Sequence, residues 1–178
     1  AGADAALPSA ADAAPAAATP ASAARAAAAP VAAGTAAAEA PARAAVPRKR
    51  TVLVVGPHPD DEVMVAGGRA LAAAKAGDRV KLVLFTNGDS GTSASHGLMR
   101  QGESVAAAEL LGLSENDVIF LGYGDQTLID MFRSSEGAKV FTSEAGQSAT
   151  YGKRGLGRAD YHRHRTGAPG PYTRDGLI

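Results

Sequence analysis

The sequence has no cysteine, no net charge and no long apolar run, and each absence excludes a class of protein. Without cysteine, the 178 residues can form neither a disulfide scaffold nor a cysteine-based zinc site. The 18 Lys+Arg balance the 18 Asp+Glu, so no broad basic surface for nucleic acid is expected. No apolar stretch reaches the roughly 18–20 residues of a transmembrane helix. We therefore expect neither a nucleic-acid partner nor a transmembrane segment.

The first fifty residues have few large apolar side chains. They hold 27 of the 42 alanines and 6 of the 10 prolines, and their larger apolar residues are Leu7, Val31 and Val46. Such a segment buries too little apolar surface to offset the entropy lost on folding. Residues 1–50 are therefore predicted to be a disordered segment or linker, and residues 51–178 the folded part. The lack of cysteine leans towards an exported protein, but no signal peptide can be read and the compartment stays open.

The folded part alternates strands with helices. Apolar, β-branched runs at 51–55, 80–85 and 118–121 are typical of buried parallel strands. Between them, residues 63–76 and 98–111 are rich in alanine and end at a glycine, which indicates helices. This order predicts a Rossmann-like α/β fold, with a mostly parallel sheet and helices on both faces.

Residues 133–178 show no clear strand or long helix. They are rich in glycine, serine and threonine, and Thr173 near the end could cap a further helix. A parallel sheet of three strands is small and leaves an edge uncovered. We therefore expect the natural domain to continue beyond Ile178, so that this chain holds its N-terminal part.

Three polar segments follow directly on the three predicted strands. They are residues 57–61, 86–91 and 123–125. Ligands of open α/β sheets bind beyond the carboxyl ends of the strands. These three segments are therefore the expected positions of a functional site.

The densest cluster of ionisable side chains is His-Pro-Asp-Asp-Glu at residues 58–62. Imidazole nitrogen and carboxylate oxygen are the donors that zinc and similar divalent ions bind. His58 and Asp61, three residues apart across a turn, can point at one ion, and Asp60 is free to take a proton from water. The alternative is a plain structural role, with Asp60 or Asp61 as a helix N-cap and His58 as a loop residue.

The run Gly-Pro-His-Pro-Asp-Asp-Glu at residues 56–62 resembles the signature of the PIG-L/LmbE-like de-N-acetylases. These are zinc hydrolases that remove acetyl from substrates bearing N-acetylglucosamine. The resemblance continues through Thr-Asn-Gly-Asp-Ser-Gly at 86–91, Arg-Gln-Gly-Glu at 100–103 and Leu-Gly-Tyr-Gly-Asp at 121–125. It covers about residues 51–130, and the order of the blocks is more specific than any one of them.

The resemblance implies a role for five residues. His58 and Asp61 would be zinc ligands and Asp60 the general base, whereas Arg100 and Asp125 match positions that contact the sugar in relatives. Two of these have simpler alternatives.

Arg100 and Glu103 are spaced as a surface ion pair on a helix, and Asp125 could only shape a glycine-rich turn.

The family's third zinc ligand, a histidine in a later His-x-x-His motif, has no match here. His162 and His164 are separated by one residue, and His96 lies in a polar loop. A catalytic zinc normally has three protein ligands. We expect the third ligand to lie beyond the end of this chain, and His162 and His164 to be loop residues.

These residues predict a zinc-dependent hydrolase that removes acetyl from an N-acetylglucosamine-type sugar or glycoconjugate and releases acetate and a free amine. One alternative is a metal hydrolase that acts on another amide or on an ester. Another is a non-catalytic carbohydrate-binding module with an incomplete metal site. The identity of the substrate and the oligomeric state cannot be read from the sequence.

Overall fold

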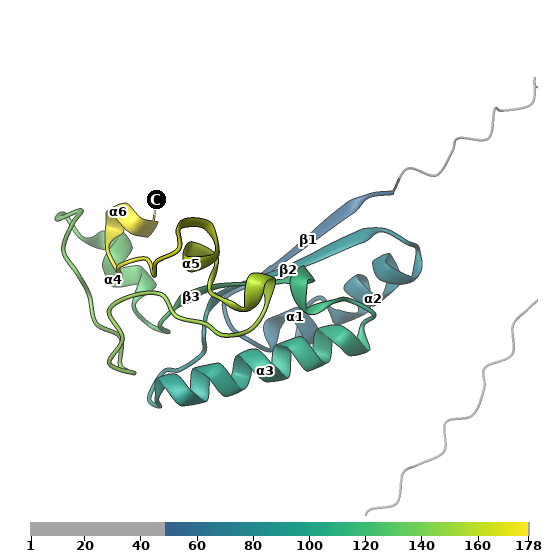
Figure 1. The fold of residues 1–178 in the computed structure, drawn as a ribbon, viewed down its shortest axis with the longest axis horizontal. Helices are drawn as coiled ribbons and strands as arrows, with labels where there is room; N and C mark the ends of the chain where they lie inside the picture. The colour runs from purple at the N-terminus through teal and green to yellow at the C-terminus, as the bar shows by residue number, and fades with distance from the viewer. Residues whose placement is uncertain (1–48, 178) are drawn as a thin grey trace, which may run out of the picture. The chain divides into compact units, whose positions relative to one another are not determined.

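A computed structural model of the chain describes residues 49–177 (Figure 1). The linker predicted for residues 1–50 lies almost entirely outside the described residues. Within them, β1 (Thr51–Gly56), β2 (Arg79–Thr86) and β3 (Val118–Tyr123) form one parallel sheet in the order β1-β2-β3. This sheet confirms the predicted α/β fold and all three predicted strands.

Helices connect the strands, as the alternating pattern predicts. After β1 come α1 (Asp61–Met64) and α2 (Gly67–Lys75), and after β2 comes α3 (Ala94–Leu110). A short 3-10 helix, η1 (Glu115–Asp117), leads into β3. Figure 1 shows α2 and α3 along the same side of the sheet.

Two helices differ from their predicted bounds. The single helix predicted over 63–76 is divided at Ala66, whose φ of −125° and ψ of 0° are not helical. The helix α3 begins at Ala94, inside the predicted polar loop, because the Ser93 side chain caps it by accepting from the backbone N–H of His96. A capping serine in a Ser/Thr-rich stretch looks like any other loop residue in the sequence.

The apolar core lies between one face of the sheet and the helices α2 and α3. Alternate residues of a strand point to the same face, and those that face the helices are buried. They pack against small and β-branched helix residues, and the cluster consists of Ala70, Ala73, Val80, Leu82, Leu84, Val105, Ala108, Val118 and Phe120. Each large side chain buried in this way stabilises the fold by about 1.5–3 kcal/mol. This core fixes the strand ends that carry the site.

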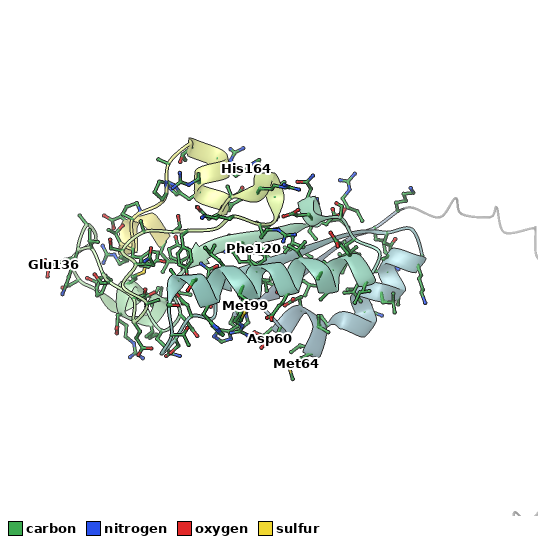
Figure 2. The ribbon with its side chains drawn as sticks, turned by 60° about the horizontal axis from the view of Figure 1, so that its bottom comes forward. Asp60, Met64, Met99, Phe120, Glu136 and His164 are labelled. Atoms are coloured by element: carbon green, nitrogen blue, oxygen red, sulfur yellow. The ribbon has the colours of Figure 1, made fainter. Side chains whose placement is uncertain are left out.

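The opposite face of the sheet is covered only in part. The helix α5 (Tyr161–Thr166) packs against β3 on that face (Figures 1 and 2). On β1, by contrast, Leu53 and Val55 are 59% and 53% exposed. Among residues 49–177, β1 is an edge strand with β2 as its neighbour.

The chain after β3 is mostly irregular, as predicted. Its regular elements are α4 (Leu128–Arg133), the 3-10 helix η2 (Leu156–Arg158), α5 and α6 (Arg174–Leu177). The Thr173 hydroxyl accepts the N–H of Gly176 in the first turn of α6, which confirms the predicted cap.

Buried polar contacts hold this irregular segment against the sheet. The Thr150 hydroxyl donates to the buried Asp160 at 2.8 Å, and the Tyr172 hydroxyl donates to the carbonyl of Gly122. Gly122 has a φ of 83°, and a Cβ there would collide with Asp160 and with the backbone of Tyr151. The close approach of the segment to β3 therefore depends on a glycine at this position. None of the helices in the described part of the chain is both long and apolar enough to span a membrane.

Candidate active site

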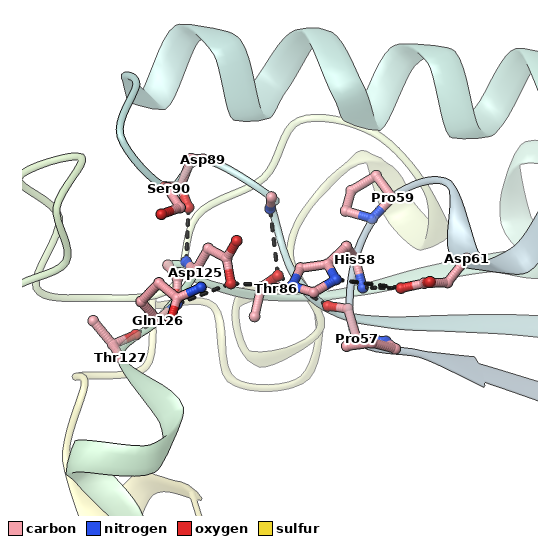
Figure 3. A network of polar contacts seen from close by, with 12 residues as sticks. Pro57, His58, Pro59, Asp61, Thr86, Asp89, Ser90, Asp125, Gln126 and Thr127 are labelled. Carbon is pink, nitrogen blue, oxygen red and sulfur yellow. Dashed lines mark hydrogen bonds and ion pairs between the residues drawn. The ribbon is translucent and has the colours of Figure 1, made fainter.

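The carboxyl ends of the three strands bring the three predicted polar segments together (Figure 3). The backbone N–H of Asp125, after β3, donates to the Asp89 carboxylate, after β2, at 2.7 Å. The Nε2 atom of His58, after β1, lies 3.2 Å from Oδ1 of Asp125. The three segments therefore meet at the edge of the sheet where the sequence predicts a functional site.

His58 and Asp61 face each other across the turn that leads into α1. Oδ2 of Asp61 accepts the backbone N–H of His58 at 2.9 Å and lies 3.3 Å from Nδ1 of the same residue. Asp61 stands in the first turn of α1. The sequence spacing of three residues therefore does place the imidazole and the carboxylate side by side.

A buried carboxylate stands behind this pair. Asp89 accepts the backbone N–H of Asp125 on one oxygen and the hydroxyl of Tyr151 on the other, the latter at 2.6 Å. Burial, and then the neighbouring Asp89, raise the pKa of the Tyr151 hydroxyl above its usual range. The hydroxyl consequently stays protonated and can donate at any ordinary pH.

The Asp60 side chain pairs with Arg100, whereas Asp61 pairs with His58. Its φ of 132° is unusual for a residue with a side chain, and such strain clusters at functional sites. The backbone N–H of Asp60 donates to Oε2 of Glu62 at 2.8 Å, and its side chain is 52% exposed. Asp60 occupies the N-cap position of α1, but its side chain makes no capping hydrogen bond. The simple capping alternative is therefore wrong for Asp60.

Arg100, from α3, closes over this turn. It donates to Oδ2 of Asp60 at 2.7 Å, to the carbonyl of Gly88 at 2.9 Å and to the carbonyl of Pro59. Gly88 has a φ of 61°, and a Cβ there would collide with the guanidinium group. The ion-pair partner of Arg100 is thus Asp60, and not Glu103 as in the surface-pair alternative.

A cavity of about 290 Å³ opens beside Asp60 and Arg100. It lies between α1 and α3, and its lining includes Glu62, Met64 and Glu103. Glu62 is buried, and its Oε1 atom has no hydrogen-bond partner among the described residues. Figure 2 shows Asp60 and Met64 near each other on the side of the sheet that carries α3.

Among residues 49–177, the remaining histidines form no metal-binding group with His58 and Asp61. His96 lies in the first turn of α3, and not in a polar loop as predicted. His162 and His164 lie on α5, not in a loop as predicted, and Figure 2 shows His164 on the other side of the sheet from Asp60. His162 Nδ1 contacts the carbonyl of Ala168 at 2.8 Å. Within residues 49–177, no three His, Asp or Glu side chains are grouped so that they could hold a metal ion.

Sequence reasoning assigned no role to Asp89, Tyr151 or Glu62. Asp89 could have been found, because it lies in a polar segment that directly follows a strand. Glu62 could also have been found, as the last residue of the acidic cluster. No pattern in the sequence places Tyr151 beside Asp89, because Tyr151 reaches the site from the irregular segment after β3.

The fold and the cluster define a class: a parallel α/β domain with a histidine and paired aspartates at the carboxyl edge of its sheet. The profile of the PIG-L family, described as GlcNAc-PI de-N-acetylase, matches residues 53–157. The chain belongs to the PIG-L family, which confirms the resemblance seen in the sequence.

No curated protein matches the sequence. Among solved structures, the chain is similar to the N,N'-diacetylchitobiose deacetylase from Pyrococcus horikoshii, complexed with its inhibitor MPG. The two are 32% identical, with a TM-score of 0.38, and the match covers 44% of this chain. This chain covers 31% of the deacetylase chain.

Proposed function

We propose that the protein is a zinc-dependent hydrolase that removes acetyl from an N-acetylglucosamine-type sugar or glycoconjugate. The observation that carries the proposal is the turn after β1 in a chain of the PIG-L family. This turn holds His58 and Asp61 together on one side and the half-exposed Asp60 on the other. A metal-dependent hydrolysis needs both functions, ion binding and proton transfer, within one small site.

The side chains fit zinc in kind and in spacing. In a tetrahedral zinc site with ligand bonds of about 2.0–2.1 Å, neighbouring ligand atoms lie about 3.3 Å apart. Nδ1 of His58 and Oδ2 of Asp61 are 3.3 Å apart. These two residues supply two of the three protein ligands that a catalytic zinc normally has. We propose that the third ligand comes from outside residues 49–177.

The chemistry follows from the positions of His58, Asp61 and Asp60. When bound, zinc would polarise the acetamide carbonyl and make water acidic enough to attack it near neutral pH. Asp60 would take the proton from the attacking water as general base. As the C–N bond breaks, Asp60 would pass this proton to the leaving amine, so that the products are acetate and a free amino group. Arg100 engages one oxygen of Asp60, which leaves the other oxygen for water.

Arg100 is the proposed sugar contact on this side. Its side chain is 21% exposed, and three hydrogen bonds to protein leave part of the guanidinium for a ligand. The cavity between α1 and α3 gives space for a part of the substrate beside Asp60. Asp125, the other predicted sugar contact, instead contacts His58 and the N–H of Gln126.

We also propose that residues 51–178 are part of a larger α/β domain, preceded by the linker predicted for residues 1–50. The support comes from β1, whose composition is that of a strand buried on both faces. Leu53 and Val55 are nevertheless more than half exposed on it. A further element that covers this face would remove the disagreement between composition and exposure.

The experiment is an assay of acetate release from a panel of N-acetylglucosamine glycoconjugates, simple amides and esters. It uses this chain and the full-length natural protein, each with zinc or with a chelator. We expect zinc-dependent release from the N-acetyl sugars, which is lost in Asp60→Asn and kept in the control Asp130→Asn, an exposed aspartate on α4. Release that is unchanged by chelator, or an active Asp60→Asn, would refute the mechanism. Activity confined to esters or other amides would refute the substrate class.

A second candidate is a non-catalytic carbohydrate-binding module. It is favoured by one observation, that the described residues supply two metal ligands and not three. Sugar binding that persists in chelator, with no acetate release by the full-length protein, would support it over the hydrolase.

A further inference from the structure

We propose that Asp125 is a positioning residue, which holds the His58 ring so that Nδ1 is presented beside Asp61. In this arrangement the buried pair Asp89 and Tyr151 holds Asp125 in turn. The inference rests on the proposed function, because it takes His58 as a metal ligand. It gives Asp125 a role other than contact with the sugar.

The first step is the orientation of the His58 ring. Its two nitrogens face two different carboxylates: Nδ1 lies 3.3 Å from Asp61 and Nε2 lies 3.2 Å from Asp125. An ion shared with Asp61 would therefore use Nδ1. The proton of the neutral ring must then sit on Nε2, where it donates to Asp125. A carboxylate behind a ligating histidine fixes the ring and makes the ligating nitrogen more basic.

The second step is that His58 needs such a partner more than Asp125 does. The His58 side chain is 38% exposed and lies in a turn, so part of its ring borders solvent and not protein. The Asp125 side chain is only 13% exposed, and Oδ1 also accepts the backbone N–H of Gln126 at 2.9 Å. The more rigid carboxylate can thus hold the less rigid imidazole.

The third step is the support behind Asp125. Its backbone N–H donates to buried Asp89, and Asp89 accepts the Tyr151 hydroxyl on its other oxygen. Tyr151 is itself anchored to two strand ends: its N–H donates to the carbonyl of Gly122, and its carbonyl accepts the Asn87 side-chain amide at 3.0 Å. A continuous chain of contacts therefore runs from the irregular segment to the candidate metal ligand. Figure 3 shows its central part, from Asp61 through His58 and Asp125 to Asp89.

The test compares the ring of His58 and the zinc affinity in wild type, Asp125→Asn and Tyr151→Phe. Nitrogen-15 NMR of the metal-free chain, at a pH about three units above the usual imidazole pKa of about 6.5, reports which ring nitrogen carries the proton. His58→Gln identifies the resonance of His58 among the four histidines. We expect the Nε2–H form in wild type and loss of that preference in Asp125→Asn. We also expect zinc affinity to fall about 10- to 100-fold in Asp125→Asn.

Tyr151→Phe keeps the aromatic ring and removes only the hydroxyl that Asp89 accepts. We expect a smaller change in the same direction, and this variant decides the question if Asp125→Asn does not fold. The matched control Asp130→Asn should change neither readout. A wild-type ring that is not in the Nε2–H form, or unchanged zinc affinity in both variants, would overturn the positioning role. Because both readouts are independent of acetate release, they can succeed where the proposed activity fails, and fail where it succeeds.

Discussion

The two sides of the turn after β1 are built differently, although they belong to one short run of sequence. On one side, His58 and Asp61 face a buried carboxylate network that is supported from β2, β3 and the irregular segment. On the other side, Asp60 is half exposed and is held by one arginine from α3. The His58–Asp61 side is backed by buried hydrogen bonds, whereas Asp60 on the other side is more open to solvent.

This difference matches the two tasks of the proposed reaction. Metal ligands must stay in a fixed geometry, which buried hydrogen bonds provide. A general base must reach a water molecule and the leaving group, so it has to be accessible. Asp60 and Asp61 are neighbours in sequence, yet Asp60 pairs with Arg100 and Asp61 with His58, so the two tasks are separated within two residues.

The largest effect is expected for Asp61→Ala, on the metal-binding side. Loss of a residue that hydrogen-bonds to a metal ligand typically reduces metal affinity about 10- to 100-fold. Loss of the ligand itself should reduce zinc affinity by more than this. Acetate release should fall to background at the same time. Calorimetric zinc titration beside the acetate assay measures both. An Asp61→Ala variant that keeps wild-type zinc affinity would refute the assignment of Asp61 as a zinc ligand.

Asp60→Asn should separate the two sides most clearly. Asparagine keeps the shape of the side chain but cannot accept a proton, so turnover should fall by about 10²- to 10⁴-fold. Zinc affinity should stay at the wild-type value, because Asp60 pairs with Arg100 and is not one of the proposed ligands. If Asp60→Asn lost zinc affinity together with turnover, Asp60 would take part in metal binding and the division into two sides would be wrong.

Arg100→Lys should have an intermediate effect, on the open side only. Lysine keeps the positive charge but cannot make the three hydrogen bonds that the guanidinium makes to Asp60, Gly88 and Pro59. We expect kcat/KM to fall about 10- to 100-fold, in line with the loss of one charge-assisted hydrogen bond. Steady-state kinetics with an N-acetyl sugar, together with zinc titration, check this. Unchanged kinetics would mean that Arg100 has no part in the site.

The smallest expected effect is on how the free energy of unfolding depends on pH, through buried tyrosines such as Tyr151 behind the His58–Asp61 side. Burial raises the pKa of Tyr151 and of Tyr172 above the usual value of about 10. As pH rises past 10, the unfolded chain loses these protons before the folded chain does, so the free energy of unfolding should decrease. Denaturant unfolding at a series of pH values, in wild type and in Tyr172→Phe, measures this. The variant should show a shallower decrease, and an equal slope would contradict the account.

The strands and their alternation with helices along the chain could be predicted because local pattern decides them. The apolar runs of β1, β2 and β3 are continuous, and glycines end the helices between them. The break at Ala66 was harder to predict, because alanine favours a helix and two glycines after it weaken a helix without having to end it. The start of α3 was missed because its cap, Ser93, lies among other small polar residues.

The candidate site was predictable as a place but not as a set of contacts. The rule that ligands bind at the carboxyl ends of parallel strands located His58, Asp89 and Asp125 correctly at one edge. It could not show that Asp125 faces His58, or that Tyr151 supports Asp89 from 62 residues away. Such pairings depend on how an irregular segment folds back, and no periodicity in the sequence records that. The substrate roles of Arg100 and Asp125 stay predictions.

The most direct test of the central claim is to measure bound zinc and acetate release in the same samples of the full-length protein. Wild type, Asp60→Asn and His58→Ala are compared at equal concentration. The account predicts zinc and activity in wild type, zinc without activity in Asp60→Asn, and neither in His58→Ala. Acetate release by His58→Ala, or zinc binding that does not depend on His58, would contradict it.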